Sequence, residues 1–347
     1  MVLLSNVPDD TFLDDFELHP GPTDPSVLYL QAEHRSTNVW KAGGGDSQRT
    51  RVRCKFPALH SRLVPILRKL RFDGIASLAG ITIDWSLITA LVERWSPETH
   101  TFHLPTGECT ITLQEVTVLL GLRIDGNAIT GSTHAEGGWK DHIKNMFGKA
   151  PDSKSQALVG SRIKLSWLDL AVPEVLADDA EERELVRYTQ AYLLQLLGGV
   201  LFTDHQGSQV HCIFIPLLQD LDRCATLSWG SGVLAFLYRE LCKSCKIDVE
   251  EMAGCVLLVQ LWAWTRLPTL APIPSPPPMD IWGDLAGPYA LRWCGPKSYV
   301  DVSSHVVCVH RLSLDVLVPL QFIWMPYTDV LDTLDEHCRK GYPSSCC

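Results

Sequence analysis

The chain has 347 residues, of which 46% are hydrophobic and 20% are charged, and its net charge is −10. This apolar content can fill one large core or two closely packed ones, which is typical of a folded protein. The net negative charge argues against a protein that coats nucleic acid with its whole surface. The most apolar run, residues 255–264, is half the roughly 20 residues that cross a bilayer, so we expect a buried helix and no membrane contact.

The N-terminal part is expected to begin with a flexible tail. Residues 1–27 are acidic and contain prolines, and residues 41–48 are glycine-rich and predict a loop. A basic segment follows, in which Arg49, Arg51, Arg53 and Lys55 alternate with other residues. On a chain of net charge −10 this segment is locally positive. The positive charge predicts either contact with phosphates or a nuclear-import signal. The alternative is an ordinary solvated surface beside a loop.

Helical periodicity and capping residues dominate the rest of the chain. We predict helices near 59–71, 84–95, 112–121, 138–147, 181–198, 210–222, 230–245, 248–266 and 311–319. Asp84 is predicted to cap the second of these helices, and Asp248 with Glu251 predicts a capping box for the eighth. Residues 268–278 are rich in proline and predict an extended excursion, whereas residues 305–310 alternate and predict a strand.

Residues 95–122, WSPETHTFHLPTGECTITLQEVTVLLGL, form the clearest local unit. Residues 99–111 predict a β-hairpin around the turn at Pro105. Thr112 and Glu115 form a capping box for the helix that follows, and Gly121 suits its C-terminal end. The sequence therefore predicts a mainly α fold, a multi-helix globular domain with a small β-hairpin and one or two minor strands.

The same unit carries a family resemblance. RWSPETHTFHLPTGE followed by TLQEVTVLLGL resembles the plant mobile domain, which is also labelled aminotransferase-like. Further similar blocks follow in order: YLLQLLGGVLF, IPLLQDLD, SWGSGVLAFLYRELC, GCVLLVQLWAWTRL and QFIWMPY. The resemblance implies a helical domain over residues 28–341. The end at 342–347 diverges from the family pattern, so we expect a C-terminally truncated and less stable domain.

Two histidines and two aspartates are the candidates for chemistry. His100 and His103 are three apart on the predicted strand, which places them on opposite faces. Glu98 is a candidate to join one of them at a metal. Asp204 lies in a glycine-containing loop, and Asp220 and Asp222 point away from each other on a helix. Paired carboxylates are what a metal-dependent nuclease requires, and this spacing disfavours the pairing.

Cysteine and cofactor chemistry receive little support. The twelve cysteines are scattered among apolar residues, and Cys242-x-x-Cys245 lacks a second pair at zinc-finger spacing, so we expect free buried thiols. No glycine-rich strand–helix turn with a suitable lysine is present for pyridoxal phosphate, so we expect no cofactor. Trp262 and Trp264 are two apart on one helix, so one of them must face a second helix layer or a partner.

Two functional interpretations stay open. The resemblance implies a nuclear, non-enzymatic interaction protein linked to transposable-element silencing, genome stability and meristem development, with nuclear and phosphatase-like protein partners. The basic segment adds a possible contact with nucleic acid. The alternative is a transposon-derived protein with a degenerate metal-dependent nuclease or another enzymatic activity. A pocket that gathers His100, His103, Asp204 and Asp222 would favour the enzyme.

Overall fold

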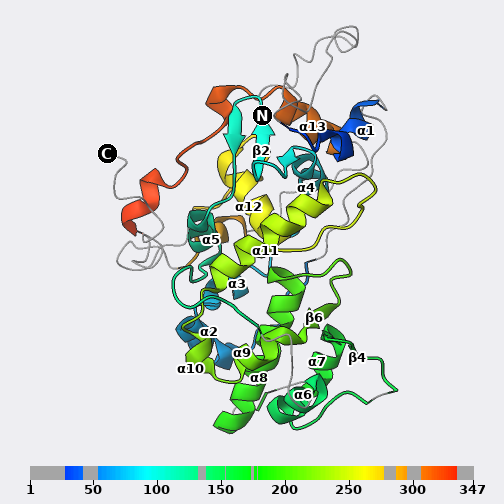
Figure 1. Cartoon of the computed structure of the whole chain (residues 1–347). Coiled ribbons are helices and arrows are strands. Elements are labelled where there is room, and N and C mark those ends of the chain that lie inside the picture. Colours follow the sequence, from blue (N-terminus) through cyan, green and yellow to red (C-terminus); the bar gives the residue numbers. More distant parts are fainter. Residues whose placement is uncertain are drawn as a thin grey trace.

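The computed structural model describes residues 28–41, 54–131, 138–152, 154–172, 176–177, 179–276, 287–294 and 306–333. The fold is mainly helical with minor strands, as the sequence predicted, and its strands form two small antiparallel sheets. Figure 1 shows α11 and α12 in the middle of the molecule, with α4 and α13 toward one end and α6, α7 and α8 toward the other. No helix among the described residues is long and apolar enough to cross a membrane.

The N-terminal helices precede the hairpin unit. Asp84 accepts the backbone N–H groups of Ser86 and Leu87, which caps α4 as predicted. Arg71 adopts a left-handed conformation that ends α2. The elements are η2 (Gln31–Glu33), α1 (Ser36–Lys41), η3 (Ser61–Leu63), α2 (Val64–Leu70), α3 (Asp73–Ala76) and α4 (Trp85–Val92).

The 95–122 unit folds as predicted, with one additional strand. β2 (Thr101–Leu104) and β3 (Gly107–Cys109) form the hairpin, and β1 (Trp95–Ser96) pairs with β2 on its other side. Thr112 and Glu115 make the predicted capping box at α5 (Leu113–Leu120). Gly121 ends α5 with a φ of 70°, a conformation that favours glycine.

The central core joins the hairpin to α11 (Trp229–Ser244) and α12 (Val256–Arg266). Both helices contact α5. Trp262 is fully buried and stacks on Phe102 of β2, with ring centroids 4.7 Å apart. Trp264 is also buried and instead contacts Trp293 of η6 (Tyr289–Trp293), 5.8 Å away. The two tryptophans therefore pack in different layers of the protein. Of the two alternatives predicted from their spacing, a second layer or a partner, the structure shows the second layer.

The other end of the molecule holds the second sheet and α8, a helix of 15 residues. Strand order is β4-β5-β6, and β6 comes from a part of the chain far from β4 and β5. The π-type turn η4 extends α8, and Gly199 in it leaves room for the backbone of Lys55, whose N–H donates to the Gly199 carbonyl at 2.8 Å. The elements are α6 (Trp139–Phe147), β4 (Leu158–Val159), β5 (Arg162–Lys164), α7 (Leu165–Ala171), α8 (Glu182–Leu196), η4 (Leu197–Leu201) and β6 (Gln209–His211).

Three predictions of secondary structure are wrong. The helix predicted at 210–222 is broken into β6, η5 (Cys212–Phe214), α9 (Ile215–Leu218) and α10 (Leu221–Cys224), because Pro216 lies at the start of α9 and Asp220 caps a new helix. The capping box at Asp248 does not form, since Asp248 has a φ of 66° and α12 begins only at Val256.

The predicted strand at 305–310 and helix at 311–319 are instead one helix, α13 (Val306–Asp315), followed by η7 (Pro319–Gln321) and η8 (Thr328–Thr333). The β-branched residues of α13 favour a strand locally, and its packing against α4 outweighs that preference. The proline-rich excursion is a turn at 268–270 followed by residues without helix or strand up to 276, while 277–278 lie outside the described residues.

Candidate functional site

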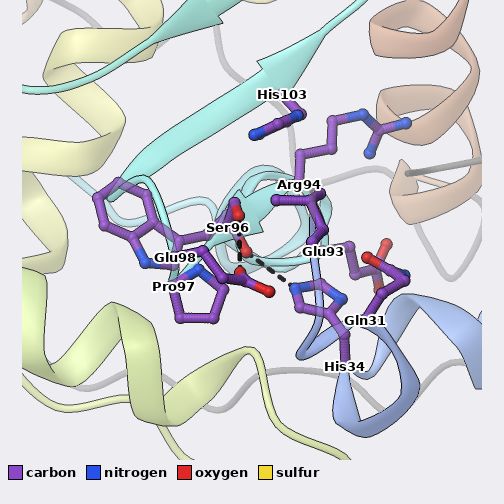
Figure 2. Close-up of a pocket in the computed structure, with 10 residues that line it drawn as sticks. Gln31, His34, Glu93, Arg94, Ser96, Pro97, Glu98 and His103 are labelled. Carbon is purple, nitrogen blue, oxygen red and sulfur yellow. Dashed lines mark hydrogen bonds between the residues drawn. The ribbon is translucent and has the colours of Figure 1, made fainter. Parts of the chain in front are cut away.

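A small pocket lies where the N-terminal segment meets the start of the hairpin unit. Figure 2 shows residues of the N-terminal segment facing the 93–98 segment and His103. The space it offers is about 10 Å³, which holds about one water molecule. Its lining residues are Leu28, Gln31, His34, Glu93, Arg94, Trp95, Ser96, Pro97, Glu98 and His103. A pocket this small has no room for an organic substrate.

Glu98 and His34 anchor the N-terminal segment in this pocket. One Glu98 oxygen accepts the Leu30 N–H at 2.7 Å and the other accepts the Ser96 hydroxyl at 2.9 Å. The His34 ring bonds the Trp95 carbonyl through Nε2, 2.9 Å away (Figure 2), and the Ser36 hydroxyl through Nδ1. Burial lowers the pKa of His34, although the Trp95 carbonyl opposes this shift. The half-buried Glu98 and the buried His34 thus both tie the N-terminal segment to the start of the hairpin unit.

Glu93 and Arg94 connect α4 to α13. Glu93 receives two hydrogen bonds from Arg311, at 2.8 and 2.7 Å, and both side chains are buried. Arg94 pairs with Asp315 and also donates to the Arg311 carbonyl. Burial alone lowers the pKa of Arg311, but the hydrogen bonds and charge of Glu93 outweigh it and raise that pKa. Burial raises the pKa of the Asp315 carboxyl, partly offset by Arg94.

A contact between His310 and Asp84 completes the link between α4 and α13, and a third ion pair joins α5 to α12. His310 Nε2 lies 3.0 Å from Asp84 Oδ2, and both side chains are buried. The Glu115 carboxylate is completely buried and accepts from Arg266, which also donates to the Trp324 carbonyl. Asp84, Glu93, Arg94 and Glu115 therefore hold neighbouring segments in place.

His100 and His103 make separate contacts, but only His103 lies on the strand on which both were predicted. His100 precedes β2 with a φ of 56°, stacks on Tyr238 at 5.8 Å and meets Trp95 edge-on. His103 lies on β2 with its Nε2 3.7 Å from Glu108 and 3.4 Å from Thr99. The His100 ring therefore packs against aromatic neighbours, and the His103 ring belongs to a partly exposed polar network.

Asp204 and Asp222 also make separate contacts. Asp204 accepts the Ser208 N–H in its turn and lies 3.7 Å from Arg162 of β5. Asp222 is exposed on α10 and pairs with Lys69 of α2. Asp220 caps α10 through the N–H groups of Asp222 and Arg223. Within the described residues, no three His, Cys, Asp or Glu side chains lie close enough to hold a metal ion.

The remaining features singled out in the sequence are the basic segment and the cysteines. Arg49, Arg51 and Arg53 lie outside the described residues, while the exposed Lys55 follows Cys54 along the surface beside η4. Among the described cysteines all thiols are free, as expected, and most are buried. Burial raises the pKa of the Cys109, Cys212 and Cys255 thiols to about 12, which makes them poor nucleophiles.

A sequence model of the plant mobile domain matches residues 72–345. The chain belongs to the plant mobile domain family. It is 40% identical over 340 residues to the Serine/threonine-protein phosphatase 7 long form homolog of Arabidopsis thaliana, which covers 94% of this chain and 25% of that protein. It is 34% identical over 332 residues to Protein MAIN-LIKE 1 of the same plant, 93% of this chain and 62% of that protein.

A further relative is Protein MAINTENANCE OF MERISTEMS of Arabidopsis thaliana, 29% identical over 322 residues, which covers 91% of this chain and 64% of that protein. The chain thus spans between a quarter and about two thirds of the length of these relatives. No solved structure matches it. The family assignment made from the 95–122 unit and the blocks after it is confirmed.

The partners of the acidic residues were not predicted from sequence. Arg266, His310 and Arg311 were not singled out from the sequence, yet each is buried against a carboxylate. The sequence does carry one sign that Arg266 is buried. It ends an almost uninterrupted apolar run, so its side chain must either be buried with that run or mark the end of the helix. The pairing of α13 with α4 joins residues more than 200 positions apart, which local patterns do not reveal.

Proposed function

We propose that this chain is a nuclear, non-enzymatic interaction domain that acts in the silencing of transposable elements and, through it, in genome stability and meristem development. The nuclear location and the silencing role rest on the family resemblance. One structural observation supports the absence of catalysis: four charged residues in and just before the family-like unit, Glu93, Arg94, Glu98 and Glu115, are engaged in internal contacts.

The proposed partners are nuclear proteins. One relative carries the name of a serine/threonine-protein phosphatase 7 homolog and aligns with nearly all of this chain, which supports a phosphatase-like protein among them. Contact with nucleic acid through Arg49, Arg51, Arg53 and Lys55 is part of the proposal. The enzymatic alternative has no observation in its favour, because Asp204 and Asp222 lie in different contacts.

Affinity purification of the tagged chain from plant nuclei tests the proposal, with proteins and nucleic acids identified in the same sample. We expect a reproducible set of nuclear proteins that survives nuclease treatment. Replacing Arg49, Arg51, Arg53 and Lys55 with Ala is expected to remove nucleic acid and to reduce the salt dependence of its binding. Recovery of no nuclear protein above an untagged control would contradict the interaction role.

A further inference from the structure

Three long stretches of the chain contain no acidic residue. They are residues 47–72, 153–168 and 205–219, in a chain that has 40 Asp and Glu among its 347 residues. The first stretch carries eight Lys and Arg residues and the second carries three. Because the stretches are far apart in the sequence and the net charge is −10, they form a positive surface only where the fold brings them together.

The second sheet brings parts of all three stretches together. β5 belongs to the second stretch and β6 to the third, and the two strands pair along residues 162–164. The Gly199 carbonyl of η4 accepts the N–H of the exposed Lys55, from the first stretch. A Cβ atom at Gly199 would also lie 3.8 Å from the side chain of Leu165, the residue after β5. Lys55 therefore lies beside the end of β5, and Figure 1 shows β4 and β6 at the end of the molecule away from α13.

The second sheet has an apolar inner face and a polar outer face. Ile163 and Val210 are paired across β5 and β6 and are buried in the core. Arg162 and Lys164 flank Ile163 on β5, so they share the opposite face, on which Arg162 is paired with His211. The Arg162 side chain is 46% exposed, and Lys164 and His211 are half-buried. The strand register thus makes these three side chains neighbours on one surface, which we call the outer face.

The charge of the outer face is positive near neutral pH. Burial, together with the charge of Arg162, lowers the pKa of His211, so the positive charge there is that of Arg162 and Lys164. Asp204 lies beside the outer face, with its Oδ2 3.7 Å from Arg162 Nη1, which is longer than a hydrogen bond. A guanidinium group has five N–H donors, so this one long contact does not saturate Arg162.

We propose that the outer face, through Arg162 and Lys164, binds the phosphate backbone of nucleic acid. This inference rests on the nucleic-acid contact in the proposed function and assigns part of that contact to the folded domain. Ser161 and Gln209 adjoin the two cations, and hydroxyl and amide groups also bind phosphate oxygens. Contacts to phosphates alone carry no sequence information, so binding is expected to be independent of sequence.

Charge density favours nucleic acid over an acidic protein as the partner. Duplex DNA carries one charge per about 1.7 Å and releases condensed counterions when a cation neutralises a phosphate. An extended acidic peptide carries at most one charge per roughly 3.3 Å. Two cations on a protein of net charge −10 therefore gain more from DNA than from a peptide.

The salt dependence of DNA binding by the full chain tests the inference, with a short fluorescent duplex of mixed sequence as the probe and anisotropy as the signal. Two phosphate contacts contribute about −1.8 to the slope of log affinity against log salt. Arg162→Gln/Lys164→Gln is expected to remove that contribution, so that raising salt from about 50 to 200 mM weakens its binding roughly tenfold less. Lys140→Gln/Lys144→Gln removes the same charge from exposed positions on α6 and is expected to leave the slope unchanged.

The variant Asp204→Asn provides a readout in the opposite direction. Its amide oxygen can still accept the Ser208 N–H, but the negative charge beside Arg162 is lost. We expect binding at low salt to tighten roughly twofold to fivefold. This gain keeps the inference testable even if the double variant misfolds, because a damaged protein does not bind more tightly.

Three results would overturn the inference. They are an unchanged slope in Arg162→Gln/Lys164→Gln, unchanged or weaker binding in Asp204→Asn, and a polyglutamate peptide that competes as well as DNA at equal charge. If replacing Arg49, Arg51, Arg53 and Lys55 still reduces the slope, the proposed function stands without the outer face. A chain that binds no DNA would contradict both the inference and the nucleic-acid contact of the proposed function.

Discussion

The buried ion pair between Glu93 and Arg311 offers a quantitative test of how α13 is held. Both side chains are less than a tenth exposed and share two hydrogen bonds. Removing one partner leaves an uncompensated buried charge, which costs about 3–5 kcal/mol, whereas replacing both with apolar residues of similar size is often nearly neutral. We therefore expect Glu93→Leu and Arg311→Met each to lower the free energy of unfolding by about 3–5 kcal/mol.

The double variant Glu93→Leu/Arg311→Met is expected to recover most of that loss, with a coupling energy of at least about 2 kcal/mol. Urea denaturation followed by tryptophan fluorescence measures all four proteins, and an unchanged slope with urea shows that the same structure unfolds. If the two single losses simply added, or if each were below about 1 kcal/mol as for a surface pair, α13 would not be held by this contact.

Three further predictions concern the fold. Gly74→Ala places a Cβ atom 2.6 Å from the Leu120 carbonyl oxygen and is expected to lower stability by about 1–3 kcal/mol, whereas Gly80→Ala, where the nearest atom is 3.9 Å away, is expected to be tolerated; equal thermal midpoints would contradict the close contact of α3 with α5. Asp220→Ala removes the cap of α10 and should cost about 1 kcal/mol, while Asp222→Ala, two residues away on the surface, should leave the urea midpoint unchanged. Burial lowers the pKa of His34 below its usual 6.5, so the unfolded chain binds this proton first and stability falls as pH drops below 6.5, by at most about 1.4 kcal/mol per pH unit. His34→Gln should flatten the curve of stability against pH between 6.5 and 5, and an unchanged slope would show that His34 is not buried in its neutral form.

Local signals in the sequence were sufficient for much of the fold. The capping box at Thr112, the cap at Asp84 and the left-handed Gly121 depend on residues within four positions, and all three form. The separation of His100 from His103 was predicted from strand alternation, but its cause is different, because His100 lies before β2 in a left-handed conformation. Such features need no knowledge of tertiary contacts.

Features that depend on distant contacts were missed. Residues 305–310 read as a strand because of their β-branched residues, and only α4 makes a helix of 306–315 favourable. The second sheet could not be predicted because β6 is more than 40 residues beyond β5. The carboxylates looked available for chemistry because their arginine and histidine partners lie 151–226 residues away.

The most direct test of the central claim is a complementation measurement. Plants that lack this protein would receive the chain carrying His100→Asn, His103→Gln, Asp204→Asn and Asp222→Asn, which keeps the size of each side chain and removes every candidate for catalysis. We predict that transcripts of transposable elements return to the silenced level, as with the unaltered chain. A variant that folds with an unchanged melting transition and still leaves those transcripts elevated would contradict a non-enzymatic role.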